Sequence, residues 1–446
     1  MKKLIIFLLL CTSLYAQHGN ISVVDSLELD TGNFRPGLSF TWSDTIAVIM
    51  SYEYVEDAHF DPTLHLLDIN TDYSIDSEID QEEHTDFQER YPNKPSQGFA
   101  TSCDSLAVFI SEINDGDLDG TISLKEIDLG DGDLVAGTVD DLEFETGDNR
   151  RGMMVALPDH TDYWIIASNA GGTDGKFYMV HRDGESLVLD DTESSGEPII
   201  PNRIFHIGDS IVVAIGIRTT STDSLGVMSA EVNPDGGDQI QAINTWLCGT
   251  MSDAIGADGY HVTHGDLGDS RKLFFSVWIN TDSTAFQFAS FGVDSATGAI
   301  DDAFIDSVYR DVYGVDPEAI GQFIGHPGNT KLGLLTWRDT SDDYYLSTID
   351  LDADGTNIRE SFIETYLIGT NTGLAAVAHT DPHETSATDS LFIVTFIDSD
   401  NDMWVKTVTV GREGPFGWQH KMNTLLAPDV NTLDNTEISK VNTLVK

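Results

Sequence analysis

Positively charged residues are scarce in this chain of 446 residues. It has 23 lysines and arginines against 75 aspartates and glutamates, which gives a formal net charge of −52 at pH 7. A polyanion of this kind repels phosphate backbones and anionic lipid surfaces. We therefore exclude nucleic acid and anionic membranes as partners. Most of the charge is interpreted as a solubilising surface.

Cysteine is also rare, and long apolar runs are confined to the N-terminus. Of the three cysteines, Cys11 lies in the first sixteen residues, so only Cys103 and Cys248 are left to pair. They fall in different strand types of distant repeats, which favours two free thiols over a disulfide. After residue 16, no apolar run approaches the roughly 18 residues that a membrane-spanning helix requires. The sequence thus predicts no transmembrane segment.

The first sixteen residues have the composition of a secretory signal peptide. Two lysines precede an apolar run over residues 4–10, and Ala16 is the small residue before a cleavage site. We expect the mature chain to begin near Gln17 and to be secreted to the periplasm, the extracellular space or the cell surface. A lipoprotein anchored through Cys11 is the weaker alternative, because Leu10 stands where a small residue is needed.

Short apolar strands recur along the rest of the chain at intervals of 47 to 62 residues. A glycine-led strand precedes most copies, and a polar turn, a third alternating strand and a looser fourth strand follow. Four antiparallel strands repeated around an axis predict an all-β fold of the β-propeller type. The apolar strands begin at Ile46, Leu106, Trp164, Ile211, Leu273, Leu332 and Leu391.

These seven copies predict a single seven-bladed propeller over residues 17–410. Residues 1–16 are the signal peptide, and residues 411–446 are a C-terminal tail or the end of the last blade. The segment Val24–Gly37 aligns without gaps on Val139–Gly152, which contains the outer strand of the second repeat. By analogy, we expect Val24–Asp30 to be an outer strand that completes the last blade and removes an exposed sheet edge.

One acidic turn in the second repeat matches the calcium-loop template DxDxDGx5E. Calcium takes six to eight oxygen ligands, and a glycine allows the sharp turn between them. The candidate ligands are Asp115, Asp117, Asp119, the carbonyl of Thr121 and a bidentate Glu126. Because strands flank the turn, it resembles the DxDxDG loops of FG-GAP propeller repeats, as in integrin α-subunits. That resemblance implies bound Ca²⁺, although here the turn follows the second strand and has Ser123 at position nine.

Two further acidic turns are weaker candidates for calcium. The last repeat has Asp398, Asp400 and Asp402 at alternate positions but lacks the glycine. A third turn contains Asp350 and two further aspartates, and it lacks a glutamate at position twelve. Solvated turns are the alternative interpretation at all three places.

The few arginines are unevenly distributed. Five of them lie just before the innermost strand of the first four repeats: Arg35, Arg90, Arg150, Arg151 and Arg203. Segments that enter the inner strands of a propeller meet around one mouth of the central channel. These guanidinium groups are therefore candidates for binding a carboxylate, sulfate or phosphate. Local pairing with acids such as Asp148 is the alternative.

No catalytic motif stands out. The chain has no GxSxG elbow, no phosphate-binding loop and no sialidase-type box, although propeller active sites are assembled from separate blades. Histidines recur near the ends of innermost strands, for example His160 and His206, and are better explained as turn residues than as metal ligands. We expect a calcium-stabilised binding protein for an anionic glycan or an extracellular protein. A polysaccharide-acting hydrolase or lyase and a structural surface component are the alternatives.

Overall fold

The computed structural model describes residues 19–30, 34–41, 46–54, 60–83, 99–102, 105–112, 119–128, 133–134, 140–146, 149–170, 174–219, 224–248, 257–267, 270–279, 285–311, 315–326, 329–351, 357–370, 375–379, 389–400 and 402–411. Regular secondary structure in these residues is β-strand throughout. None of them belongs to a helix with the length and hydropathy to cross a bilayer.

The strands of the described residues form seven antiparallel sheets, which we number 1 to 7 in the chain order of their innermost strands. Sheet 1 contains β2 (Phe34–Thr41), β3 (Ile46–Tyr54), β4 (Phe60–Ile69) and β5 (Ile75–Glu83). Sheet 2 contains β6 (Phe99–Ser102), β7 (Ser105–Glu112), β8 (Asp119–Asp128) and β10 (Asp140–Glu145), with β9 (Asp133–Leu134) also paired to β8. Sheet 3 contains β11 (Asn149–Leu157), β12 (His160–Ala170), β13 (Asp174–Asp183) and β14 (Ser186–Ser194). Sheet 4 contains β15 (Ile199–Ile207), β16 (Ile211–Arg218), β17 (Ser224–Val232) and β18 (Ile240–Cys248).

The remaining three sheets continue the same pattern. Sheet 5 contains β19 (Ala257–Asp266), β20 (Arg271–Ile279), β21 (Ala285–Asp294) and β22 (Asp306–Asp311). Sheet 6 contains β23 (Val315–His326), β24 (Asn329–Asp339), β25 (Tyr344–Asp350) and β26 (Glu364–Gly369). Sheet 7 contains β27 (Ala375–His379), β28 (Asp389–Ile397), β29 (Met403–Gly411) and, as its outer strand, β1 (Ile21–Asp30).

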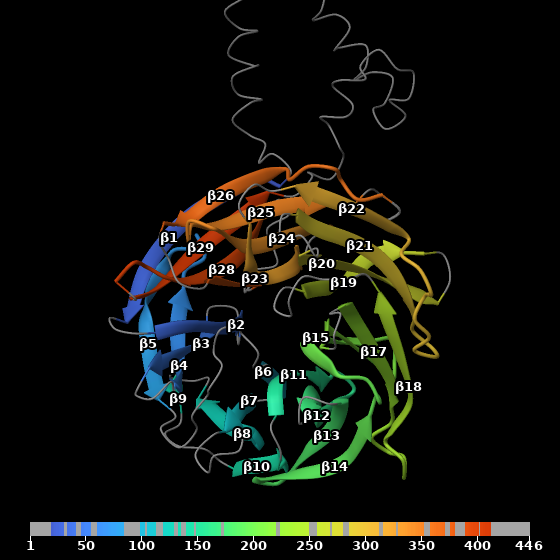
Figure 1. Ribbon diagram of the computed structural model, residues 1–446. Helices are drawn as coiled ribbons and strands as arrows, with labels where there is room; N and C mark the ends of the chain where they lie inside the picture. The colour runs from blue at the N-terminus through green and yellow to red at the C-terminus, as the bar shows by residue number, and fades with distance from the viewer. Residues whose placement is uncertain are drawn as a thin grey trace, which may run out of the picture.

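The sheets are arranged around a common centre (Figure 1). The first strands lie innermost and contact one another: β11 touches β6 and β15, β19 touches β15 and β23, and β27 touches β23 and β2. The fourth strands lie at the outside of the ring. This radial arrangement of antiparallel sheets is the β-propeller architecture that the repeats predict.

The hydrophobic core lies between neighbouring sheets, and β16 shows how the sequence produces it. Its residues from 211 to 217 are all buried. Val212 and Ala214 pack in a cluster shared with sheet 3, whereas Val213 and Ile215 pack in a cluster shared with sheet 5. Successive side chains of a strand point to opposite faces. A strand buried on both faces therefore appears as the continuous apolar run seen at the start of each repeat.

The N-terminal strand pairs with the last strand of the chain. Residues of β1 from Ile21 to Asp30 lie antiparallel to β29, with Ile21 opposite Val410 and Asp30 opposite Met403. The main-chain amide of Gly19 also donates to the carbonyl of Gly411, at 2.6 Å. Sheet 7 is thus built from both ends of the described chain.

Candidate functional site

Three consecutive innermost strands place polar side chains at the same level of the ring. Arg203 of β15 lies opposite Ile215, and Asp258 of β19 lies opposite Val277. The amide of Gln322 in β23 donates to Thr336 Oγ1, at 2.8 Å. The three partner residues, Ile215, Val277 and Thr336, each lie four residues after the start of an apolar strand. Those strands begin at Ile211, Leu273 and Leu332. Arg203, Asp258 and Gln322 therefore occupy equivalent positions, and we call them the hub cluster.

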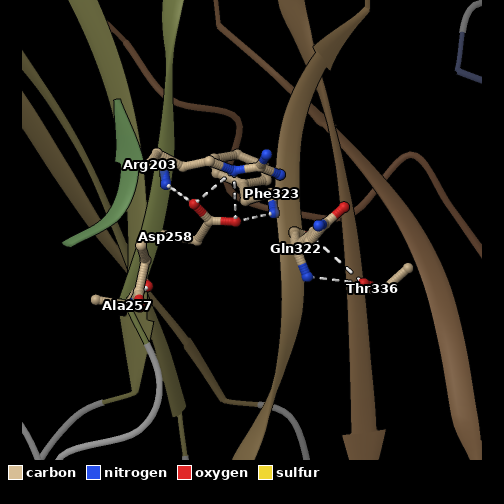
Figure 2. Close-up of polar contacts among 8 residues, drawn as sticks. Arg203, Ala257, Asp258, Gln322, Phe323 and Thr336 are labelled. Carbon is tan, nitrogen blue, oxygen red and sulfur yellow. Dashed lines mark hydrogen bonds and ion pairs between the residues drawn. The ribbon is translucent and has the colours of Figure 1, made fainter. Parts of the chain in front are cut away.

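Asp258 joins the three strands of the hub cluster (Figure 2). Its side chain is buried and accepts hydrogen bonds from Arg203 Nε at 3.2 Å, from the amide of Phe323 at 2.7 Å and from its neighbour Gly259 at 2.8 Å. One carboxylate thus receives donors from β15, β19 and β23. Removing one member of such a buried pair leaves an uncompensated charge, so the cluster depends on both partners.

Burial raises the pKa of the Asp258 carboxyl above its usual value, because the interior disfavours the charged form. The positive charge of Arg203 and the amides of Phe323 and Gly259 act in the opposite direction, since they stabilise the carboxylate. The guanidinium of Arg203 is therefore engaged by an acid of the next sheet, 55 residues away in the sequence, and not by a sequence neighbour.

Several atoms of the hub cluster are buried without a hydrogen-bond partner in the described part of the chain. They are Arg203 Nη2 and both side-chain amide atoms of Gln322, a residue that is 2% exposed. Buried polar groups are nearly always paired, and an unpaired one costs about 1–3 kcal/mol. The cluster therefore offers a guanidinium donor, an amide donor and an amide acceptor to a polar ligand or to water.

Sequence reasoning identified Arg203 but missed Asp258 and Gln322. A usable signal was present, because both residues flank the glycines that mark the innermost strands of their repeats: Asp258 precedes Gly259 and Gln322 follows Gly321. The other arginines are not brought to this cluster by any described contact. The main chains of Arg35, Arg150 and Arg151 lie in β2 and β11. Their side chains and the whole of Arg90 lie outside the described residues.

The calcium-type turn of sheet 2 lies between β7 and β8. Asp115 and Asp117 fall outside the described residues, and Asp119 is the first residue of β8. Within β8, Thr121 pairs with both Ile110 and Glu143. Glu126 lies seven residues after Asp119 in the same extended strand, which separates the two by about 20 Å. Ca²⁺ ligands lie 2.3–2.6 Å from the ion, so these two carboxylates cannot share one ion while β8 is formed.

The acidic turn of sheet 7 is stabilised by its own hydrogen bonds. Asp398 Oδ1 accepts from the amides of Asp400 and Asp402, at 2.9 and 3.1 Å, and Oδ2 accepts from Trp404 Nε1 at 3.0 Å. Asp339 makes the same turn in sheet 6, where Tyr345 takes the place of the tryptophan. An aspartate that bonds the amides two and four residues onward is a common turn device. In the third turn, Asp350 forms an ion pair with Arg359.

Two of the recurring histidines lie together. His160 and His206 line a cavity of about 210 Å³ between sheets 3 and 4, together with Asp159, Asp209 and Glu231. Burial lowers the pKa of His206, although Asp159 and Asp209 partly offset this effect. Within the described residues, no three histidine, cysteine or acidic side chains are arranged to hold a metal ion. His326 is instead buried, with Nε2 2.9 Å from the carbonyl of Val410.

No protein-family model matches the chain, and no curated protein matches its sequence. Among solved structures, the chain is similar to a periplasmic gluconolactonase of Pseudomonas aeruginosa, with 13% identity over 86% of this chain and 96% of that one, at a TM-score of 0.52. It is also similar to a neuraminidase-like protein from A/bat/Guatemala/164/2009, with 8% identity over 90% and 96% of the two chains, at a TM-score of 0.46. Drosophila Plexin A, in complex with Semaphorin 1b, gives 8% identity over 88% of each chain and a TM-score of 0.46. At 13% identity, the first similarity shows a shared β-propeller fold.

Proposed function

We propose that this protein is an exported binding protein, a closed seven-bladed propeller whose hub cluster holds an anionic glycan or an acidic segment of an extracellular protein. The observation that carries the proposal is the set of buried atoms on Arg203 and Gln322 that have no hydrogen-bond partner among the described residues. A ligand carboxylate accepts hydrogen bonds from a guanidinium, and sugar hydroxyls both donate to and accept from an amide. Both chemistries are present in an acidic sugar.

The position of these atoms sets how the ligand reaches them. They have no solvent exposure, so binding follows a local opening of the inner strands and is slower than diffusion. The chain also carries a net charge of −52, which repels an anionic ligand at long range. Because salt screens that repulsion, we expect affinity to increase between about 0.01 M and 0.15 M ionic strength. Binding carried by exposed arginines alone would weaken over the same range.

The proposal is tested by passing the mature protein over neutral and anionic polysaccharides while recording retention and shortened products. Gln322→Leu removes the unpartnered amide at nearly constant volume, and Gln241→Leu is the matched control on the exposed outer strand β18. Retention that falls in Gln322→Leu alone supports the hub cluster as the binding site. Equal retention in both variants contradicts it. Shortened products would instead identify a polysaccharide-acting enzyme. The absence of both retention and products would favour a structural component.

We also propose that Ca²⁺ stabilises the turn before β8 through Asp115, Asp117 and Asp119, without Glu126. Three carboxylates at alternate positions suit a hard cation that prefers oxygen ligands. Calcium at 100 times its dissociation constant should stabilise the fold by about 2.7 kcal/mol. Thermal melts with calcium and with chelator test this, and Asp117→Ala should abolish the difference. Identical melts of the unaltered protein would refute it.

A further inference from the structure

Hydrogen bonds between a carboxylate on the outer strand of one sheet and a main-chain amide of the next connect the outer parts of neighbouring sheets. We call them rim clasps. Each runs in the same direction around the ring, from an acid in one sheet to an amide in the following sheet. Asp25 accepts from Ile75 (3.0 Å), Asp140 from Leu187 (2.6 Å), Asp191 from Gln239 and Ile240 (both 2.9 Å), Asp306 from Ile358 (2.8 Å) and Glu364 from Ile21 (2.7 Å).

The residue that donates to a rim clasp also fills the gap between the two sheets. Ile240 is 1% exposed and packs in the cluster between sheets 3 and 4, and Ile358 packs in the cluster between sheets 5 and 6. Ile21 and Leu187 are likewise buried. An amide beside such an apolar side chain is shielded from water, so it needs a protein acceptor. The carboxylate supplies one and fixes the apolar side chain at the junction.

At two of the five rim clasps, a β-bulge lies beside the carboxylate residue. Asp25 directly follows a bulge in β1, and Asp191 lies opposite Met179 beside a bulge in β14. An extra residue in a strand bends it and changes where the next side chain points. By the same register, Asp80 lies beside a bulge in β5 and Asn244 beside a bulge in β18. In their strands, Asp80 and Asn244 thus occupy the positions that Asp25 and Asp191 occupy in theirs. Asp80 lies at the junction of sheet 1 with sheet 2, and Asn244 lies at the junction of sheet 4 with sheet 5.

We propose that the rim clasps form one continuous device, and that the clasp of Glu364 on Ile21 is the latch that holds the N-terminal strand in place. At this junction, unlike the others, the clasped amide belongs to a segment from the far end of the chain. Sheet 6 holds that segment at two points, through Glu364 Oε2 and through Thr348 Oγ1, which donates to the carbonyl of Gly19 at 2.7 Å. Thr348 also positions Glu364, because its Oγ1 accepts from the Glu364 amide at 3.2 Å.

Gly19 shows how closely the latched segment approaches sheet 6. Its φ of +74° lies in the left-handed region, and a Cβ added there would meet Ile363 at 2.8 Å. Glycine therefore suits this position on both conformational and steric grounds. The latch is independent of any ligand at the hub cluster, so it is tested separately from the proposed function.

The test is hydrogen exchange of the β1 amides in the full mature chain. A hydrogen bond to a charged acceptor is worth enough that Glu364→Ala should accelerate exchange of Ile21–Leu29 about tenfold or more. Glu364→Gln keeps an acceptor oxygen and should restore most of the protection. Asp306→Ala is the matched control, because it removes the equivalent clasp one junction earlier and should leave β1 protected.

Thr348→Val provides a second variant of similar shape, should Glu364→Ala fail to fold. It removes the hydroxyl that holds Gly19 and positions Glu364, and it should accelerate β1 exchange about fivefold. Faster exchange confined to β1 in either variant supports the latch. Unchanged β1 exchange in a folded variant, or equal acceleration in Asp306→Ala, would overturn it.

Discussion

At the rim of the ring, Asp191 accepts hydrogen bonds from two amides of the next sheet, whereas at the hub Gln322 is buried with neither side-chain amide atom partnered in the described chain. The rim acids are half-buried, keep one side in water and satisfy amides that would otherwise be stranded. At the hub, Asp258 and Gln322 are buried and Arg203 is partly exposed, and polar atoms of Arg203 and Gln322 lack hydrogen-bond partners in the described part of the chain. Departures from complete pairing concentrate at functional sites, which is why the hub rather than the acidic rim is the better place to look for a ligand.

The largest expected effect is at the hub. Asp258→Ala should lower the free energy of unfolding by about 3 kcal/mol, because it leaves the partly buried Arg203 guanidinium without its counter-charge. Two amides lose their acceptor in the same step. Urea denaturation of the variant measures the loss.

A double substitution tests whether the stability lost in Asp258→Ala comes from the uncompensated charge of Arg203 or from the altered shape of the side chains. Arg203→Leu combined with Asp258→Leu removes both charges and should recover most of the stability lost in the single variant. A double variant as unstable as Asp258→Ala would show that shape, rather than compensation of charge, is what the pair provides.

His261, in the innermost strand β19, should make the fold sensitive to acid. Burial lowers the pKa of His261 to about 4, and the positive charge of Lys272 adds to this shift. Between that value and the usual 6.5, the unfolded chain binds a proton that the folded chain does not. This contribution to stability is therefore complete above pH 6.5 and is lost as the pH falls towards 4, to a total of about 3 kcal/mol.

Urea midpoints measured between pH 7.5 and 4.5 test this. His261→Phe should make the midpoint depend less steeply on pH over that window. An equally steep slope in the variant would assign the acid sensitivity to other groups.

At the rim, a single clasp should matter less. Asp191→Ala should cost about 1–2 kcal/mol, because two amides beside a buried isoleucine lose an acceptor that remains partly hydrated. Asp191→Asn should cost less, since its side-chain oxygen still accepts. Thermal melts of these variants, with exposed Glu193→Ala from the same strand as control, measure the difference. A loss in Asp191→Ala no greater than in Glu193→Ala would mean that the clasps are incidental.

The smallest effect on stability is expected at Gln322 of the hub cluster. Gln322→Leu should change the free energy of unfolding by at most about 1 kcal/mol, in the stabilising direction, because it replaces an unpartnered polar group with an apolar one. Denaturation without ligand checks this. A loss of more than about 2 kcal/mol would indicate a partner for the amide and would weaken the distinction between hub and rim.

The sequence predicted the strands well because their burial leaves a direct trace. The run from Ile211 to Ile217 is apolar at nearly every position, since both faces of β16 are covered. The outer position of the N-terminal strand was also predictable, because its residues align with those before the third repeat. The pairing of β1 with β29 accords with that prediction.

The hub and the rim were harder to predict because their partners are far apart in the chain. Arg203 and Asp258 are 55 residues apart, and Glu364 and Ile21 are 343 apart, so no local pattern connects them. The calcium template likewise matches residue types over positions 115–126, yet residues 119–128 form an extended strand that carries Glu126 away from Asp119. A motif fixes spacing along the chain, whereas coordination depends on how the chain bends.

The pairing of β1 with β29 also sets an order of events during folding. Thr409 and Ser22 contact each other although 387 residues separate them. Contacts between such distant residues form late, because closing so long a loop costs entropy before any contact compensates for it. The first strand to leave the ribosome must wait for the last one. Until β29 has been synthesised, β1 has no partner strand in sheet 7 and its backbone hydrogen-bonding groups stay unpaired.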